Sequence, residues 1–130
     1  MKHFLAGPSE PIASLPHHAR TLSDWQCALV LHVVSRAYDI SPYLILHPKR
    51  CMATTALARQ LSMYLAHVLL GRQFKEVGRV FGRDRTTVSY ACAKVEDMRD
   101  DPRFEDELAD LERQITDLLE LQEGDGHGAL

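Results

Sequence analysis

The chain has 130 residues, of which 45% are hydrophobic, so it can form one modest core and is too short for two ordinary domains. Its formal net charge of -3 hides a strong asymmetry. Residues 47–99 carry ten Lys or Arg against four Asp or Glu, a balance of +6, whereas residues 100–130 carry two against eleven, a balance of -9. The middle of the chain can therefore attract a polyanion such as a nucleic acid, and residues 100–130 cannot.

Three cysteines, Cys27, Cys51 and Cys92, form no pair motif. This usage is typical of free thiols in a reducing cytoplasm. No run approaches the ~18 apolar residues of a membrane-spanning helix, and the N-terminus lacks a charged start followed by an apolar core. We therefore expect a soluble cytoplasmic protein without a membrane partner.

Residues 1–22 contain three prolines and no sustained apolar period, which predicts a flexible N-terminal arm. Adjacent histidines at His17 and His18 could bind a metal ion. Because no second cluster lies at ligand spacing, we expect neither a metal nor a cofactor.

A first helix is predicted over residues 25–37, with Ser23 or Asp24 as its N-cap. The apolar residues at helical spacing predict that Trp25 anchors the core on one side of this helix. His32 lies on the same side and is expected to be partly buried.

A short turn of helix follows, in which Ser41 is the cap and Pro42 takes the first helical position. His47 and the proline after it end this helix. A basic loop that contains Lys49 and Arg50 comes next.

The basic loop leads into a long helix that we expect to be capped by Thr54 or Thr55 and to end at Leu70. Arg59 and Gln60 lie near its start and off its apolar stripe. These two side chains either touch a ligand or belong to an ordinary solvated surface.

Residues 69–99 predict two helices separated by a tight turn. Apolar side chains recur at helical spacing from Phe74 to Phe81, and Gly82 ends the run because glycine adopts the left-handed conformation at little cost. Asp84 then offers a side-chain oxygen to the free amides of a second helix over residues 84–99.

The second of these helices has two distinct faces. The apolar face consists of Val88, Ala91, Cys92, Val95 and Met98. The opposite face carries donors, acceptors and positive charge, namely Arg85, Thr86, Thr87, Tyr90 and Lys94. Arg83 in the turn adds a further cation. This pattern indicates a helix-turn-helix, which places its second helix in the major groove of DNA.

A final helix is predicted over residues 102–122, with Asp101 as cap and Pro102 at the first helical position. Its leucine-rich stripe covers the core and could also seat a protein partner or a second copy. Residues 123–130 contain three glycines and should be disordered. The sequence thus predicts an all-α bundle of about five to six helices around a helix-turn-helix, in one domain over residues 23–122.

A resemblance to a known family rests on three stretches of the sequence, ARQLSMYLA, EVGRVFG and RDRTTVSYACAKVE. Residues 58–96 closely resemble the C-terminal DNA-binding domain of the bacterial replication initiator DnaA, and a looser similarity extends over residues 25–119. The TTV and AC elements, at a fixed distance from ARQ, make the resemblance specific. It implies an all-helical bundle around a helix-turn-helix and a ligand of double-stranded DNA that carries a short asymmetric box.

The resemblance also implies roles for single residues. It assigns contacts with bases or flanking phosphates in the major groove to Asp84, Arg85, Thr86, Thr87, Tyr90 and Lys94. Arg59 and Gln60 match a pair that grips the DNA backbone, and the loop at Lys49 and Arg50 matches one that sends an arginine into the minor groove. From the residues alone, Asp84 is equally well explained as a helix cap.

Several positions depart from the family pattern. The turn before the recognition helix is one glycine shorter, and Arg85 and Tyr90 stand where the family has histidines. The basic loop has lost several arginines, with Ala53 and Leu57 at two of their positions. The P-loop motif GxxxxGK[ST] of the family's ATPase module does not occur in the sequence.

These features predict a stand-alone, sequence-specific DNA-binding protein that is not an enzyme and binds no nucleotide. A transcriptional regulator is favoured, because a DNA reader without an ATPase more naturally recruits or blocks than remodels. One alternative is a regulator of replication initiation that competes for initiator boxes. Another is a protein-interaction adaptor that has lost DNA binding. We expect a cytoplasmic protein associated with the nucleoid.

Overall fold

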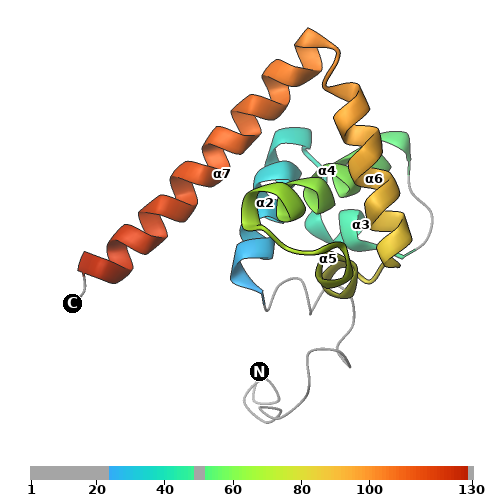
Figure 1. Ribbon diagram of the computed structural model, residues 1–130. Helices are drawn as coiled ribbons and strands as arrows, with labels where there is room; N and C mark the ends of the chain where they lie inside the picture. The colour runs from blue at the N-terminus through green and yellow to red at the C-terminus, as the bar shows by residue number, and fades with distance from the viewer. Residues whose placement is uncertain (1–23, 49–51, 129–130) are drawn as a thin grey trace.

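The structure is a computed structural model that describes residues 24–48 and 52–128, with side chains up to Gln122. Within these ranges the chain is all helical and contains no strand, as predicted. The helices in chain order are α2 (Trp25–Tyr38), α3 (Pro42–Leu46), α4 (Ala53–Leu70), α5 (Phe74–Phe81), α6 (Arg85–Met98) and α7 (Pro102–Gly128) (Figure 1). The predicted arm over residues 1–22 and the loop residues Lys49, Arg50 and Cys51 lie outside the described part.

Side-chain hydrogen bonds cap the starts of α2 and α3. The Asp24 carboxylate accepts the backbone N–H of Cys27 at 3.2 Å at the start of α2. The Ser41 hydroxyl accepts the N–H of Tyr43 at 3.2 Å, one residue after Pro42 opens α3. These side chains satisfy amides that have no partner inside the helix. Both caps agree with the sequence prediction.

Two predicted boundaries are wrong. Helix α4 begins at Ala53, with Met52 at the N-cap and no side-chain cap, so neither Thr54 nor Thr55 starts it. Helix α7 continues to Gly128, although we predicted an end at residue 122. Glycine weakens a helix by only about 1 kcal/mol per residue, and this segment contains no proline that would remove a backbone donor.

Helix α4 is the centre of the bundle, because α2, α3, α5, α6 and α7 all contact it (Figure 1). Six successive residues, Leu61 to Ala66, are all buried. A helix that is covered on every side has no polar face. The hydroxyl of Ser62 in this buried stretch donates to the Ala58 carbonyl at 2.8 Å.

The predicted orientation of α2 is wrong. Trp25 is 52% exposed and His32 is also exposed, so neither belongs to the core. The side of α2 that packs inward consists of Cys27, Val30, Leu31, Val33 and Val34. Helix α2 has apolar residues on two sides, and only its packing against α4 decides which side is buried.

The buried cysteines Cys27 and Cys92 are free thiols, as predicted. Burial raises the pKa of Cys27 to about 12 and that of Cys92 to about 11. Both thiols therefore stay protonated near neutral pH and behave as small apolar side chains.

Helix α7 folds back across α2 and α4 and buries Phe104, Leu108, Leu111 and Ile115 there. Within the described residues, neither α7 nor any other helix is long and apolar enough to cross a membrane.

Arg99 fixes the bend between α6 and α7. Its Nε donates to Glu105 at 2.7 Å, and its Nη1 donates to Glu112 at 3.1 Å and to the Tyr64 hydroxyl at 2.8 Å. The Tyr64 hydroxyl in turn donates to Glu96 at 2.6 Å. One guanidinium thus joins α4 and α6 to two acidic side chains of α7.

This network shifts two ionisation equilibria. The hydrogen bonds from Arg99 lower the pKa of Glu105. Burial, together with the bond to Glu96, raises the pKa of Tyr64 to about 12. A carboxyl group whose pKa is lowered by folding stabilises the fold above its unfolded pKa, and this contribution is lost as the pH falls through the folded value.

We expect Arg99→Met to lower the free energy of unfolding at pH 7, because it leaves Glu105 and Glu112 without their cation. The difference from the parent protein should shrink as the pH falls below the ordinary glutamate pKa of about 4.3. Urea denaturation at neutral and acidic pH measures both effects. Arg103→Met, at an exposed position nearby on α7, is the control and should change little. If Arg99→Met lowers the free energy of unfolding equally at both pH values, the role given to Arg99 is contradicted.

Candidate nucleic-acid interface

The turn between α5 and α6 is closed by backbone contacts. Helix α5 ends at Gly82, whose φ of 70° is left-handed, and the N–H of Arg83 donates to the carbonyl of Gly78 at 2.8 Å. Gly78 itself is buried, and a Cβ at this position would collide with the carbonyl oxygen of Arg83. The sequence predicted that the helix ends at Gly82. No sequence pattern indicated that Gly78 allows the Arg83 carbonyl to lie so close to α5.

The inner faces of the two helices fasten this unit to the bundle. Helix α5 buries Val77, Val80 and Phe81. Helix α6 buries Val88, Ala91, Cys92 and Val95, four of the five predicted apolar positions. The fifth, Met98, is partly buried. The face of α6 that packs inward was therefore predicted correctly.

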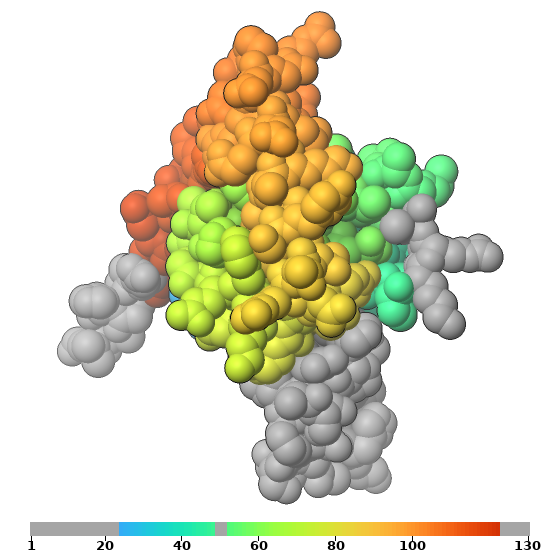
Figure 2. Space-filling model, turned by 45° about the vertical axis from the view of Figure 1, so that its right-hand side comes forward, coloured from blue at the N-terminus to red at the C-terminus, as the bar shows by residue number. Residues whose placement is uncertain are grey.

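The outer face of α6 is open to solvent along its length. Arg85, Thr86, Thr87, Tyr90 and Lys94 are all exposed, Tyr90 by 74%. In the space-filling view α6 (yellow to orange) forms the front surface, and the red part of α7 lies behind it (Figure 2). The acidic helix packs on α2 and α4 and does not cover this face.

Asp84 occupies the N-cap position of α6, as predicted, but its side chain makes no capping hydrogen bond. The exposed carboxylate is not used to cap the helix. It therefore remains able to accept a hydrogen bond from a ligand next to Arg85.

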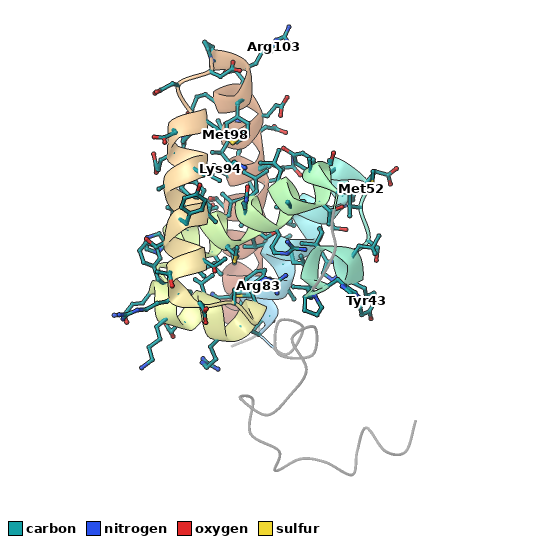
Figure 3. All side chains as sticks on the ribbon, turned by 90° about the vertical axis from the view of Figure 1, so that its right-hand side faces the viewer. Tyr43, Met52, Arg83, Lys94, Met98 and Arg103 are labelled. Carbon is teal, nitrogen blue, oxygen red and sulfur yellow. The ribbon has the colours of Figure 1, made fainter. Side chains whose placement is uncertain are left out.

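Arg59 and Arg83 meet at the end of α3, where the basic loop begins. Arg83 donates from Nη2 to the His47 carbonyl at 2.9 Å and from Nη1 to the Phe81 carbonyl at 3.0 Å. Arg59 donates from Nε to the Ile45 carbonyl at 2.7 Å and from Nη2 to the His47 carbonyl at 3.3 Å. The two guanidiniums satisfy carbonyls at a helix end and link α3, α4 and the helix-turn-helix. Figure 3 shows Arg83 beneath α6 and Lys94 higher on it.

The remaining predicted positions are less well placed. Gln60 is partly buried, and its Oε1 is enclosed without a hydrogen-bond partner among the described residues. Lys49 and Arg50 lie outside the described residues. The structure therefore gathers the predicted positions from Asp84 to Lys94 on one exposed surface, whereas Arg59, Gln60 and Arg83 are partly buried.

Sequence reasoning missed Lys75 as a member of this surface. A hollow of about 400 Å³ between α5 and α6 is lined by Gln73, Phe74, Lys75, Arg85, Thr86 and Ser89. Lys75 and Arg85 thus bring two cations to one concavity. The available signal was a lysine in the first turn of the first helix of the motif. Exposed cations at such a place attract phosphates.

Comparison with known proteins identifies related sequences. The family model described as "Bacterial dnaA protein helix-turn-helix" matches residues 27–95. The chromosomal replication initiator protein DnaA of Bradyrhizobium sp. (strain ORS 278) is 40% identical over 90 residues, which cover 68% of this chain and 19% of the relative. The DnaA of Rhodopseudomonas palustris (strain BisA53) is 39% identical over 90 residues, with the same two shares.

The DnaA of Brucella abortus biovar 1 (strain 9-941) is also 39% identical over 90 residues, covering 68% of this chain and 18% of the relative. The chain thus spans less than a fifth of the length of these relatives. The match of the family model over residues 27–95 includes α5, the turn and most of α6.

We expect Gly78→Ala to destabilise the protein by about 1 to 3 kcal/mol, because the added methyl group must push the turn away from α5. The free energy of unfolding in urea is the measurement. Arg79→Ala changes the neighbouring residue, whose side chain is exposed, and should stay within about 0.5 kcal/mol of the parent. If Gly78→Ala and Arg79→Ala are equally stable, the close contact between the Arg83 carbonyl and Gly78 is contradicted.

Proposed function

Because the chain belongs to the family of bacterial DnaA helix-turn-helix domains, we propose that it binds double-stranded DNA with the outer face of α6 in the major groove. The observation that carries the proposal is the exposure of Arg85, Thr86, Thr87, Tyr90 and Lys94 on one side of a helix whose other side is buried. A recognition helix needs both properties, because its inner side must hold it rigid while its outer side reads bases.

The residue types on this face suit base recognition. Arg85 can hold a guanine through two hydrogen bonds, Asp84 can accept from the amino group of a cytosine, and a threonine methyl group can pack on that of a thymine. Lys94, and Lys75 at the hollow beside Arg85, are suited to phosphates, which set position and salt dependence more than sequence preference.

Arg59 and Arg83 act in this proposal mainly by holding the start of the basic loop. Both guanidiniums donate hydrogen bonds to backbone carbonyls of the protein, so their contribution to DNA affinity is largely indirect. Gln60, Lys49 and Arg50 remain proposed contacts with the DNA backbone or minor groove, on the strength of family membership.

The biological role proposed is that of a non-enzymatic regulator at the nucleoid. Transcriptional regulation and control of replication initiation by occupying initiator boxes require the same protein–DNA contact, and membership of the DnaA family fits the second role about as well as the first. Genome-wide mapping of bound sites separates them, because one predicts occupancy at promoters and the other at clustered initiator boxes.

A role as protein-interaction adaptor is the second candidate. The exposed side of α7 carries Asp106, Glu107, Asp110, Asp117 and Glu120, a charge that repels DNA and can attract a basic partner. We propose α7 as the surface for a protein partner or for self-association.

We expect Arg85→Ala to weaken binding to duplexes selected by the parent protein from a randomised library. The loss should be ~1 to 3 kcal/mol, the value of a good base contact, as measured by fluorescence anisotropy. Lys94→Ala should make the slope of log affinity against log salt concentration shallower by roughly 0.9 per lost phosphate contact.

The matched control is Arg103→Ala, which removes the same charge from an exposed position on α7, away from α6 (Figure 3). Its affinity for the selected duplexes should stay close to that of the parent. The proposal is contradicted if the parent shows no salt-dependent binding, or if the control loses as much affinity as the Arg85 variant.

A further inference from the structure

Helix α2 has a second, outward stripe in addition to its buried side. Trp25, Leu29, His32 and Arg36 follow one another at spacings of four, three and four residues, which places them on one face of the helix. Trp25 is 52% exposed, Leu29 is partly buried, and His32 and Arg36 are exposed. This stripe is apolar at its beginning and basic at its end.

Helix α7 extends beyond the core that it covers. Among the side chains of α7 that the structure describes, which end at Gln122, the last buried one is Ile115, and Leu118 and Leu121 beyond it are 37% and 60% exposed. Figure 1 shows this end of α7 standing away from the rest of the bundle. Among the described side chains beyond Ile115, Leu119 is partly buried against the core, whereas the apolar side chains of Leu118 and Leu121 are left open to solvent.

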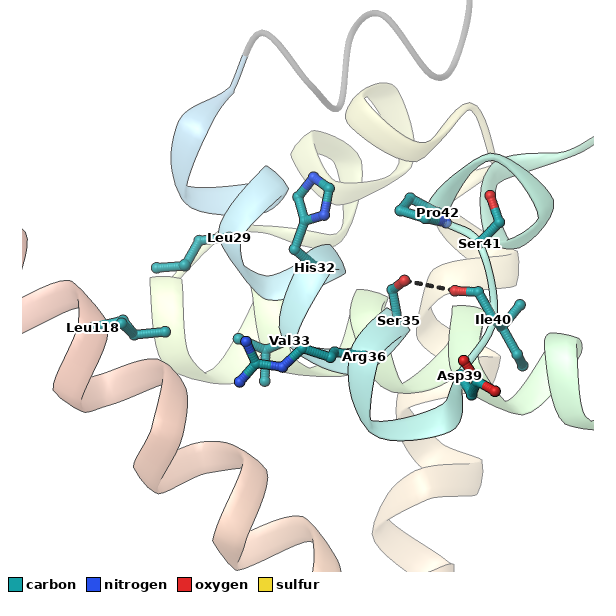
Figure 4. A pocket seen from close by; sticks show the side chains of 10 residues that line it. All are labelled: Leu29, His32, Val33, Ser35, Arg36, Asp39, Ile40, Ser41, Pro42 and Leu118. Atoms are coloured by element: carbon teal, nitrogen blue, oxygen red, sulfur yellow. Dashed lines mark hydrogen bonds between the residues drawn. The ribbon is translucent and has the colours of Figure 1, made fainter.

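A groove of about 540 Å³ lies between these two elements. Its walls include Leu29, His32 and Arg36 from α2 and Leu118 from α7. In Figure 4 the guanidinium of Arg36 extends toward α7, and Leu118 faces α2 across the gap. The groove is thus apolar at Leu29 and Leu118, and its wall next to α2 carries both the cation of Arg36 and the carboxylate of Asp39.

The cation on the α2 side of this groove is opposite in sign to the carboxylates of the α7 side. Arg36 lies on the α2 side, and the exposed Asp117 and Glu120 flank the leucines of α7. Among the described residues, none of these three side chains has an ion pair or hydrogen bond. A surface with an apolar centre and opposite charges on its two sides can pair with a copy of itself.

We propose that the occupant of this groove is the end of α7 from a second copy of the chain, which makes the protein a symmetric dimer. Leu118 and Leu121 of each copy pack near Trp25 and Leu29 of the other, and Asp117 and Glu120 approach the other copy's Arg36. The contact is isologous, since each chain gives the helix end and receives it. This proposal deepens the self-association suggested for α7 and needs no DNA.

The dimer leaves both recognition helices accessible. The outer face of α6 lies away from the groove between α2 and α7 (Figures 1 and 2). Two such faces in one particle can bind two sites on one DNA, and the second contact is then strengthened by a high effective concentration.

Sedimentation velocity of the full chain without DNA, from ~1 to ~200 µM, tests the proposal. The parent should shift with concentration from its monomer mass of 14.7 kDa to twice that mass. Leu118→Glu with Leu121→Glu should raise the dissociation constant at least ~10-fold, as expected when apolar contacts are replaced by charges. Leu44→Glu, at a position on α3 that is 56% exposed, is the matched control and should dimerise like the parent.

Charge reversal distinguishes this contact from unspecific association. Arg36→Glu should weaken the dimer, and adding Asp117→Arg with Glu120→Arg should restore it. The proposal is overturned if the parent stays monomeric at the highest concentration. It is also overturned if the double leucine variant dimerises like the parent, or if the two arginine substitutions on α7 do not restore the dimer of Arg36→Glu. Circular dichroism verifies the fold of each variant. DNA affinity of the same samples tests the proposed function separately, since one α6 suffices for a single site.

Discussion

The burial of α4 on every side is the constraint on which the rest of the structure depends. Because the stretch from Leu61 to Ala66 exposes no face to solvent, every other helix has to be placed against it. Helices α5 and α6 pack there through their apolar sides, which leaves the polar side of α6 turned outward. The orientation of the proposed DNA-binding surface is thus a consequence of hydrophobic burial.

Charge separation is the second requirement of the proposed function. Residues 100–130 carry a balance of -9, and acidic side chains beside α6 would weaken its attraction for phosphates. The hydrogen bonds of Arg99 to Glu105 and Glu112 hold α7 on the side of α2 and α4. One arginine therefore supports both the stability of the bundle and the electrostatic contrast between its two sides.

Much of this arrangement could be predicted from local sequence signals. The cap at Ser41 with Pro42, the stop at Gly82 and the two faces of α6 depend on residues that are neighbours along the chain, and each was predicted correctly. The family resemblance is likewise confirmed by the match over residues 27–95.

The remaining features depend on contacts between distant segments. Trp25 was assigned to the core because α2 is apolar on two sides, and only tertiary packing selects between them. Arg59 and Arg83 look like free cations in the sequence, yet they bind carbonyls of α3 and its end. Likewise, no periodicity marks Gly78, whose importance arises from the passage of the Arg83 carbonyl beside it.

The most direct test of the central claim is a nuclear magnetic resonance titration of the protein with a selected duplex, followed through the backbone amides. The account predicts that the largest shift changes lie between Arg85 and Lys94 and in the adjoining turn, with little change in α7 from Phe104 to Gln122. Changes concentrated on α7, or an α6 that does not respond to DNA, would contradict it.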